Sequence, residues 1–292
     1  KFDALFEGAA RTPDELLTQK HMDLAASIQA VTEEIVLRLT RSLAKEMRIE
    51  NLCLAGGVAL NCVANGKVLR DGAFKRIWVQ PAAGDAGGAL GAALSAYYLF
   101  EGAQRSTSTG ADRMRGAYLG PAFADGDVAE RLTAAGANFT LMSDDQVIED
   151  TVCALSDGKA VGWFQGRMEF GPWALGGRSI LGDPRSPSMQ KTLNLRVKYR
   201  ESFRPFAPSV LREDVSQWFE LDNDSPYMLI VADVVSDRRR AMTNDEKALF
   251  GIKKLNLTRS EIPAVTHVDY SARVQTVHSE TNPRYHRLLK KF

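Results

Sequence analysis

The chain has 292 residues and a mass of 32.1 kDa, which suits one large domain or two domains of ordinary size. Hydrophobic residues make up 45% and charged residues 25%, the balance of a globular protein, so a disordered or fibrous chain is excluded. Lys and Arg number 37 against 36 Asp and Glu, and the net charge of +1 provides no global basic field for nucleic acid. No apolar run approaches the roughly 18 residues of a membrane helix.

The cysteines and the start of the chain bear on its compartment. Cys53, Cys62 and Cys153 include no CxxC pair, which argues against a disulfide framework or structural zinc and favours a reducing, cytoplasmic compartment. Their apolar neighbours predict buried, inert thiols. The chain begins with Lys1 and no signal peptide follows, so we expect a piece of a longer protein.

The first hundred residues predict an alternation of helices and strands. Apolar residues recur every three or four positions from Glu15 to Met47, which predicts one long amphipathic helix with Leu24, Ile28, Val31, Ile35, Leu39 and Leu43 on its buried face. Strands are predicted at 51–55 and 76–80, and helices at 58–69 and 85–100. This strand–turn–helix order is typical of an α/β domain.

A polar stretch at 101–115 is the best candidate for a linker, because it is rich in Ser, Thr and Gly and lacks apolar periodicity. After it, strands are predicted at 160–164, 228–235 and 273–277. Two domains, 1–112 and 113–292, are therefore the working hypothesis.

A double glycine follows the first predicted strand, in the sequence AGGVALN. Gly56 and Gly57 allow backbone N–H groups to approach an anion closely, and the next helix start adds partial positive charge. A close-packed turn is the plain alternative. Further along, Asp85 begins a helix of small residues, GDAGGALGAA. A helix cap is its ordinary role, while a hard-metal ligand is the functional alternative.

The richest segment runs from Arg167 to Arg204 and contains eight Lys or Arg residues against three Asp or Glu. Its charges alternate with Gly, Pro and aromatic residues instead of helix-forming polar residues, which favours a pocket over a solvated face. Arg and Lys are suited to phosphate oxygens. Nucleic acid is the other partner that such a segment could serve, but a compact phosphate-bearing substrate fits better.

Five motifs in this order resemble the O-carbamoyltransferases of the nodulation-protein and antibiotic-biosynthesis type: GGVALN, GDAGGALGAA, GRMEFGPWALGGRSILGDPR, KYRESFRPFAPSV and HVDYSARVQTV. The resemblance covers essentially the whole chain. It implies an α/β protein with the second half of an actin-like ATPase (ASKHA) domain, followed by a YrdC-like domain with a mixed twisted sheet. It also implies a two-step reaction, in which carbamoyl phosphate and ATP give carbamoyladenylate and the carbamoyl group then passes to a substrate hydroxyl.

The resemblance also implies roles for particular residues. Gly56, Gly57 and Asn61 would hold the adenylate or its phosphate. A second set would grip carbamoyl phosphate and the ATP phosphates, with Lys198, Arg204 and Arg178 catalytic and Arg167 and Arg200 binding. Asp85 would be one ligand of an iron(II) ion whose two other ligands, the histidines of an HxxxH motif, lie upstream, and Mg²⁺ is a second expected ion.

Two departures from the family pattern stand out. Tyr270 occupies a position where relatives often have Gly, so the local turn is expected to differ. The family also continues past Phe292, so we expect the fragment alone to be inactive in transfer. The expected partner is a small carbohydrate-like acceptor: a lipochitooligosaccharide nodulation factor, which we favour weakly, an aminoglycoside or a cephem. Neither a membrane nor a nucleic acid is expected as a partner. A homodimer is a further expectation.

Two other functions are alternatives to O-carbamoyl transfer. A hydrogenase-maturation carbamoyltransferase uses similar domains in the reverse order with upstream CxxC pairs, and no CxxC occurs here. A tRNA-modification-like module that binds nucleotide or RNA without O-transfer would show strong salt-dependent RNA binding. The near-zero net charge argues against it.

Overall fold

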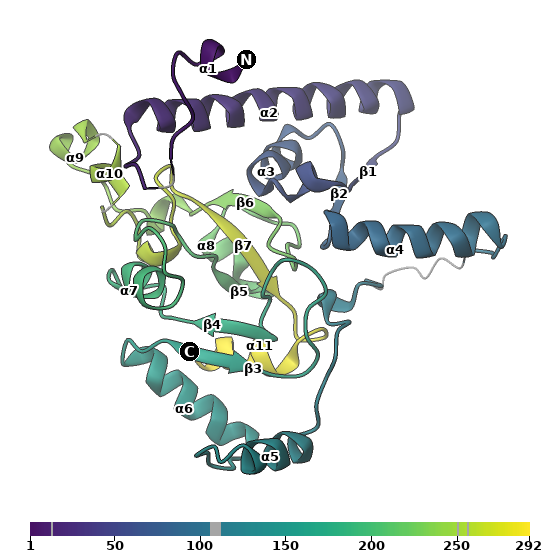
Figure 1. Ribbon diagram of the computed structural model, residues 1–292, viewed down its shortest axis with the longest axis vertical. Helices are drawn as coiled ribbons and strands as arrows, with labels where there is room; N and C mark the ends of the chain where they lie inside the picture. Colours follow the sequence, from purple (N-terminus) through teal and green to yellow (C-terminus); the bar gives the residue numbers. More distant parts are fainter. Residues whose placement is uncertain (13, 106–111, 250, 256) are drawn as a thin grey trace.

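The computed structural model describes residues 1–292 except 13, 106–111, 250 and 256 (Figure 1). Its first part is a parallel pair of strands with helices around it. The elements are α1 (Phe2–Leu5), α2 (Gln19–Met47), β1 (Asn51–Leu54), α3 (Cys62–Asp71), β2 (Arg76–Val79) and α4 (Asp85–Ser95), which continues as a π-helix (Ala96–Phe100). In Figure 1, α2 lies across the top of this part, and α4 projects away from the body of the molecule.

The predicted strands and helices of this part are confirmed to within a few residues. Strands β1 and β2 pair in parallel, with Asn51 opposite Arg76. The helix predicted over 58–69 is interrupted, because a 3-10 turn (Gly57–Leu60) comes first and Asn61 leaves helical geometry before α3 begins. The Oδ1 atom of Asn61 accepts a hydrogen bond from the backbone N–H of Ala64 at 3.1 Å and so caps α3.

The long helix α2 is present, but its buried face was predicted wrongly. Ile28, Val31, Ile35 and Leu39 are each more than half exposed. The helix instead packs through Val36, Leu37 and Ala44 onto a core of Leu52, Val68 and Phe74. The periodicity shows which residues share a face, whereas the position of α3 decides which face is covered.

Helix α3 joins the first part of the chain to the second, because its backbone lies directly against β6 (Ile230–Asp233). A Cβ atom at Gly66 would lie 2.3 Å from the carbonyl oxygen of Val231, so only glycine allows this approach. On either side, the Asn65 amide donates to the carbonyl of Leu229 at 3.0 Å, and Arg70 donates to the carbonyl of Val231 at 2.9 Å. The two parts are thereby tied by polar contacts to main-chain oxygens.

The second part contains two small sheets and short helices. Its strands and helices are α5 (Asp125–Ala134), α6 (Asp144–Ser156), β3 (Val161–Phe164), β4 (Arg178–Leu181), α7 (Met189–Arg196), β5 (Ser209–Leu211), α8 (Val215–Trp218), β6, α9 (Asn244–Ala248), α10 (Ile252–Leu255), β7 (Ser271–Val277) and α11 (Pro283–Lys291). Strands β3 and β4 form an antiparallel pair. The other sheet has the order β5-β7-β6, with β7 parallel to β5 and antiparallel to β6.

The mixed sheet carries the largest apolar core of this part. Val234, Ala272 and Val274 are fully buried in it, together with Phe219 and Val215 from α8 and its C-terminal end. The predicted α/β class and the mixed sheet are thus confirmed, while the ASKHA-like and YrdC-like assignments and the two domain boundaries stay predictions. Most of the predicted linker, 106–111, lies outside the described residues.

The exposure of the cysteines and the character of the helices bear on two expectations from the sequence. Cys53 and Cys153 are exposed and Cys62 is half-buried, so the prediction of three buried thiols is wrong. Short strands and helix surfaces leave side chains accessible even where the neighbouring sequence is apolar. Among the described residues, no helix combines the length and the apolar character that a membrane span requires.

Candidate functional site: a cationic cluster beside the glycine turn

The glycine turn connects β1 to α3 and is open on its outer side. Gly56 has a φ of +93°, a conformation that favours glycine, and its N–H donates to the carbonyl of Ala83 at 2.8 Å. Apart from the adjoining residues, no atom of the described part of the chain lies within 4 Å of the position that a Cβ would take at Gly56 or Gly57. Asn61 is less available, because its carboxamide exchanges hydrogen bonds with Gln29 besides capping α3. The turn therefore has room for a ligand, while Asn61 has a structural role.

A buried asparagine organises the predicted basic loop after α7. Asn194 is fully buried, and its amide donates to the carbonyls of Ser202 and Arg204 at 3.1 and 2.7 Å. Its Oδ1 accepts from Nε of Arg200 at 2.7 Å. Burial, followed by the charge of Arg204, lowers the pKa of Arg200. Arg204 pairs with Glu201 at 3.2 Å, and Lys198 is exposed at the edge of the loop.

Arg273 brings this loop together with the start of α3. It lies on β7, and its guanidinium is 4.4 Å from the ring centre of Trp173. Burial, followed by the nearby charge of Arg200, lowers the pKa of Arg273, while Cys62 acts in the opposite direction. Cys62 is the first residue of α3, and its own thiol pKa is raised by burial against the opposing effect of Arg273. The glycine turn and the basic loop, which the sequence singled out separately, thus meet at Arg273.

The turn before β7 places a histidine and a carboxylate next to Arg273. His267 Nδ1 lies 3.1 Å from Oγ of Ser271, whose hydroxyl donates to Oδ1 of Asp269 at 2.7 Å. Burial lowers the pKa of His267, Arg273 adds to this effect, and Asp269 opposes it. Tyr270, in the same turn, has a φ of +67°. A tyrosine therefore occupies the left-handed region here, and the expected departure from the family pattern stays a prediction.

Arg259 is a buried cation with unused donors. It is only 3% exposed, and its Nη1 donates to the carbonyl of Leu257 at 3.1 Å. Its Nε and Nη2 groups have no acceptor in the part of the chain that the structure describes. Buried donors without a partner are rare in folded proteins. Burial lowers the pKa of Arg259, while the charges of Tyr270 and Asp269 act against this effect. An anion bound here would satisfy the free N–H groups.

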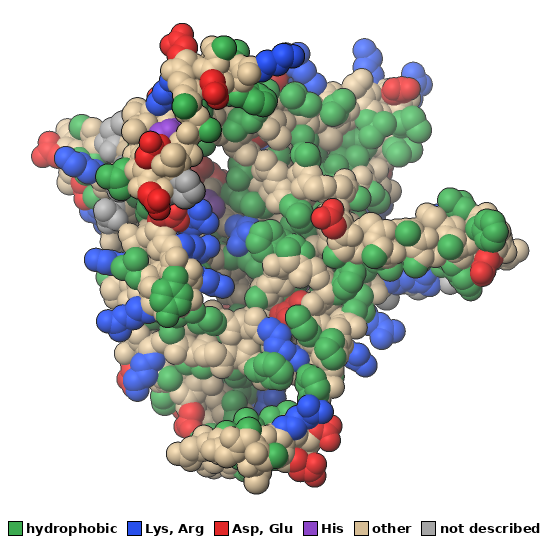
Figure 2. Space-filling model, in the orientation of Figure 1, with side chains coloured by type: hydrophobic (Ala, Val, Ile, Leu, Met, Phe, Trp, Pro, Cys, Tyr) green, Lys and Arg blue, Asp and Glu red, His purple; other side chains and the backbone are tan. Residues whose placement is uncertain are grey.

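We define the cationic cluster as Lys198, Arg200, Arg204, Arg259 and Arg273. Figure 2 shows a hollow in one face of the molecule, with Lys and Arg side chains along its edge and a histidine inside. Sequence reasoning found the first three members but missed Arg259 and Arg273. Arg273 comes from a strand without a local excess of charge, whereas Arg259 follows Lys253 and Lys254 in a short basic stretch that the sequence analysis did not single out.

Two other predicted arginines are engaged elsewhere. Arg178 donates to the carbonyls of Gln165, Gly177 and Gly166 at 2.7 to 3.1 Å and lies 3.5 Å from the ring centre of Phe164. Arg167 donates to the carbonyl of Gly120 at 3.0 Å and lines a separate groove. Their predicted phosphate contacts stay predictions, and in this structure both side chains help to hold the loop that joins β3 to β4.

The same loop is held by a carboxylate that the sequence analysis did not select. Glu169 is 7% exposed, and its Oε1 accepts hydrogen bonds from the backbone N–H groups of Leu175, Gly177 and Arg178 at 2.8, 2.7 and 3.3 Å. A single acidic residue among glycines in a basic segment is the signal that could have identified it. By fixing this loop, Glu169 also fixes the position of Trp173 against Arg273.

The described residues do not complete a metal site. Asp85 is the exposed first residue of α4. No group of three or more His, Cys, Asp or Glu side chains in the described part of the chain is placed to hold a metal ion. Asp85 could supply one oxygen ligand.

Comparisons with known proteins agree with the five motifs. Residues 1–94 match the family profile described as Carbamoyltransferase N-terminus, and residues 152–292 match Carbamoyltransferase C-terminus. The chain is 58% identical to the uncharacterized protein sll1178 of Synechocystis, over 100% of this chain and 48% of the relative. It is 42% identical to nodulation protein NolNO of Sinorhizobium fredii, over 94% of this chain and 37% of the relative.

A relative with a named reaction is also similar. The chain is 33% identical to the 3'-hydroxymethylcephem-O-carbamoyltransferase of Streptomyces clavuligerus, over 82% of this chain and 39% of the relative. The chain spans less than half the length of each of these three relatives. With both profiles matched in order along the sequence, the chain belongs to the carbamoyltransferase family.

Proposed function

We propose that the chain carries the carbamoyladenylate-forming site of an ATP-dependent O-carbamoyltransferase. The overall reaction at this site converts one carbamoyl phosphate, one ATP and one water into carbamoyladenylate, pyrophosphate and inorganic phosphate. Water first releases phosphate from the carbamoyl group, and the resulting carbamate oxygen then attacks the α-phosphorus of ATP. The carbamoyl group is next transferred to an acceptor hydroxyl, and AMP leaves.

The observation that carries this proposal is that Arg200 and Arg273, which come from distant segments, are near enough for the charge of Arg200 to act on Arg273, and that Arg273 also acts on the thiol of Cys62 at the start of α3. Arg200 comes from the loop after α7, and Arg273 comes from β7 and lies by Cys62. Negative charge shifts onto phosphoryl oxygens and the leaving group in both phosphate-releasing steps, and fixed guanidinium groups stabilise that charge best when they are already in place. Asn194 holds Arg200, and Trp173 holds Arg273.

The members of the cationic cluster have distinct parts in this proposal. Arg259 offers Nε and Nη2 to a phosphoryl oxygen, since both lack a protein acceptor. Lys198 and Arg204 lie in the same loop as Arg200, where they can meet the more exposed phosphates. The glycine turn, with open space at Gly56 and Gly57, offers backbone room for the adenylate. His267 stays neutral near pH 7, because its pKa is lowered.

We propose a hydroxyl on a sugar-type molecule as the acceptor. One relative is named for O-carbamoylation of a hydroxymethyl cephem, and others are named as nodulation proteins. The higher identity to the nodulation protein, 42% against 33%, favours an acceptor of the nodulation type. These substrates, with ATP, fit a cytoplasmic enzyme. Iron(II) at Asp85, with Mg²⁺ on ATP, is part of the proposal only through the family resemblance.

Exchange of labelled pyrophosphate into ATP tests the proposal, using the 292-residue chain with and without carbamoyl phosphate. We expect exchange only when carbamoyl phosphate is present, and a loss of at least 100-fold in Arg273→Gln. Arg38→Gln is the matched control, because Arg38 is an exposed arginine on α2 far along the chain from the cluster. Equal exchange in Arg273→Gln and the wild type would contradict the proposed site, as would exchange that is independent of carbamoyl phosphate.

A further inference from the structure

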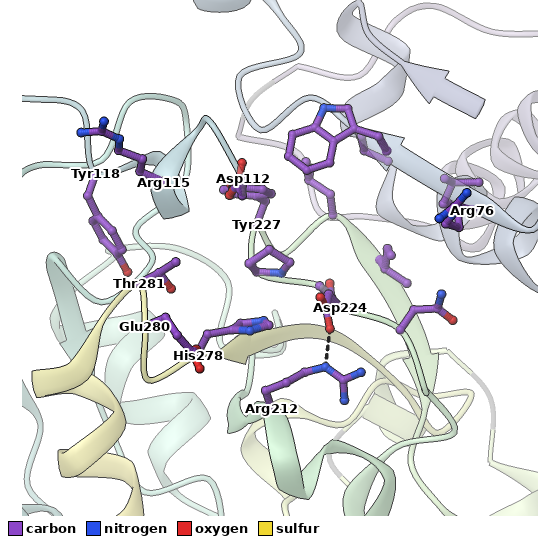
Figure 3. A pocket seen from close by; sticks show the side chains of 18 of the residues that line it. Arg76, Asp112, Arg115, Tyr118, Arg212, Asp224, Tyr227, His278, Glu280 and Thr281 are labelled. Atoms are coloured by element: carbon purple, nitrogen blue, oxygen red, sulfur yellow. Dashed lines mark hydrogen bonds and ion pairs between the residues drawn. The ribbon is translucent and has the colours of Figure 1, made fainter. Parts of the chain in front are cut away.

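A groove separate from the cationic cluster lies between β2 and the segment that leads into β6. Its volume is about 1300 Å³, and it is lined by side chains from 76–79, 112–119, 222–230 and 278–281, with a few from neighbouring segments (Figure 3). No member of the cationic cluster is among its lining residues in the described part of the chain. The proposed carbamoyladenylate chemistry therefore leaves this groove unused.

An aromatic pair forms one wall of the groove. Trp78 is 37% exposed although it lies on a strand, and its ring meets that of Tyr227 edge to face, with centroids 5.8 Å apart. The indole N–H donates to Oε1 of Gln80 at 3.3 Å, and the buried Tyr227 donates its hydroxyl to Asp112. Both rings are thus held in place from behind, and Trp78 offers a fixed flat surface to a ligand.

The charges that line the groove balance one another. The four arginines are Arg76, Arg115, Arg167 and Arg212, and the four acidic residues are Asp112, Asp222, Asp224 and Glu280. Figure 3 shows the ion pair between Arg212 and Asp224 on the groove wall. A phosphate-rich ligand would favour an excess of arginine, and a cationic ligand an excess of carboxylate. The balance favours a neutral ligand.

Several polar groups in the groove are free to bind such a ligand. The side chains of Arg115, Asp222 and Asn223 make no hydrogen bond or ion pair with the described residues. They provide donors and acceptors at separate places along the groove. A pyranose ring has the complementary chemistry, since its C–H faces are apolar and its rim carries hydroxyls that both donate and accept. Pockets that combine apolar walls with a few fixed polar groups are typical ligand sites.

We propose that this groove binds a neutral oligosaccharide, with one sugar ring stacked on Trp78 and the hydroxyls of further rings held by polar side chains elsewhere along the groove, among them Asn223 and Asp222. The inference rests on the proposed function, because it makes the groove the site for a part of the sugar-type acceptor remote from the hydroxyl that is carbamoylated. It assigns acceptor recognition to residues outside the cationic cluster, so the two sites can be tested one at a time.

Titration with neutral tetrasaccharides tests the inference, using cellotetraose, tetra-N-acetylchitotetraose and maltotetraose as probes and calorimetry and saturation-transfer NMR as readouts. We expect at least one probe to bind with a dissociation constant below about 1 mM, and Trp78→Ala and Asn223→Ala each to weaken it at least tenfold. Tyr97→Ala removes a more exposed aromatic ring outside the groove and should leave binding unchanged. Thermal unfolding of each variant confirms that it is folded.

The outcomes separate the groove from the cationic cluster. Saccharide binding that survives in Arg273→Gln, together with pyrophosphate exchange that survives in Trp78→Ala, supports the inference. Three results would overturn it: no binding of any probe to the folded wild type, undiminished binding to folded Trp78→Ala, or displacement of the bound saccharide by ATP. If any of these results is found while pyrophosphate exchange still depends on carbamoyl phosphate, the proposed function stands and the saccharide site is wrong. If exchange is absent while saccharide still binds, the proposed function is wrong and the groove remains a saccharide site.

Discussion

Removing the Glu169 carboxylate tests how the loop between β3 and β4 is held. The side chain is 7% exposed and accepts three backbone hydrogen bonds, two of them at 2.8 and 2.7 Å. A hydrogen bond to a charged group contributes about 1.5–3 kcal/mol. Two such bonds give about 3–6 kcal/mol for Glu169→Ala, because the substitution leaves buried N–H groups without an acceptor. Glu169→Gln keeps an acceptor oxygen and should cost about 1–2 kcal/mol.

Urea unfolding followed by circular dichroism measures these free energies, and an unchanged slope shows that the comparison is valid. The control is Glu34→Ala, because Glu34 is an exposed residue whose ion pair with Arg38 should contribute less than about 1 kcal/mol. Glu169→Ala within about 1 kcal/mol of wild type would refute the argument. So would equal losses for the Ala and Gln variants, since the acceptor oxygen would then be irrelevant.

Three further predictions concern single residues near the cationic cluster. Tyr270→Gly should be about 1 kcal/mol more stable than Tyr270→Ala in urea unfolding, because only glycine relieves the positive φ while both lose the ring; equal stabilities would contradict this. The pKa of His267 is lower in the folded protein than in the unfolded chain, so unfolding at low pH takes up a proton. The free energy of unfolding should therefore fall as the pH drops below about 6.5, the ordinary pKa of histidine, and this loss should shrink in His267→Gln. Iodoacetamide should label exposed Cys53 before Cys62, whose thiol pKa is raised by burial, and ATP with carbamoyl phosphate should slow Cys62 further; peptide mass spectrometry measures both rates.

Local sequence signals predicted most of the elements. Short apolar runs bounded by turn residues, Gly56 after the first and Pro81 after the second, placed β1 and β2 to within a residue, because turn chemistry and strand pattern are local properties. The local sequence does not determine which face of α2 is buried. Ile35 and Leu39 share a stripe with Ile28, but the partner helix covers a different face. The interruption at Asn61 was also missed, because the asparagine caps a new helix at a point where the apolar pattern alone would let the helix continue.

The candidate site was predictable only in the part that is contiguous in sequence. The loop with Lys198, Arg200 and Arg204 is visible as a charge excess, whereas Arg273 comes from a strand that shows no such excess. Arg259 comes from a second short basic stretch that is distant in sequence from this loop. Tertiary packing decides both the burial of Arg259 and the contact of Arg273 with the start of α3. The groove at Trp78 is also a product of the fold, because its walls come from four separate segments.

Detection of the intermediate itself tests the central claim most directly. The 292-residue chain is incubated with ATP and ¹³C-labelled carbamoyl phosphate, and the quenched mixture is analysed by ¹³C NMR and mass spectrometry. Labelled carbamoyladenylate should form with the wild type and with Arg38→Gln, and should be absent with folded Arg259→Gln and Arg273→Gln. Formation at wild-type rates in both cluster variants, or consumption of carbamoyl phosphate and ATP by the wild type without any labelled adenylate, would contradict the account.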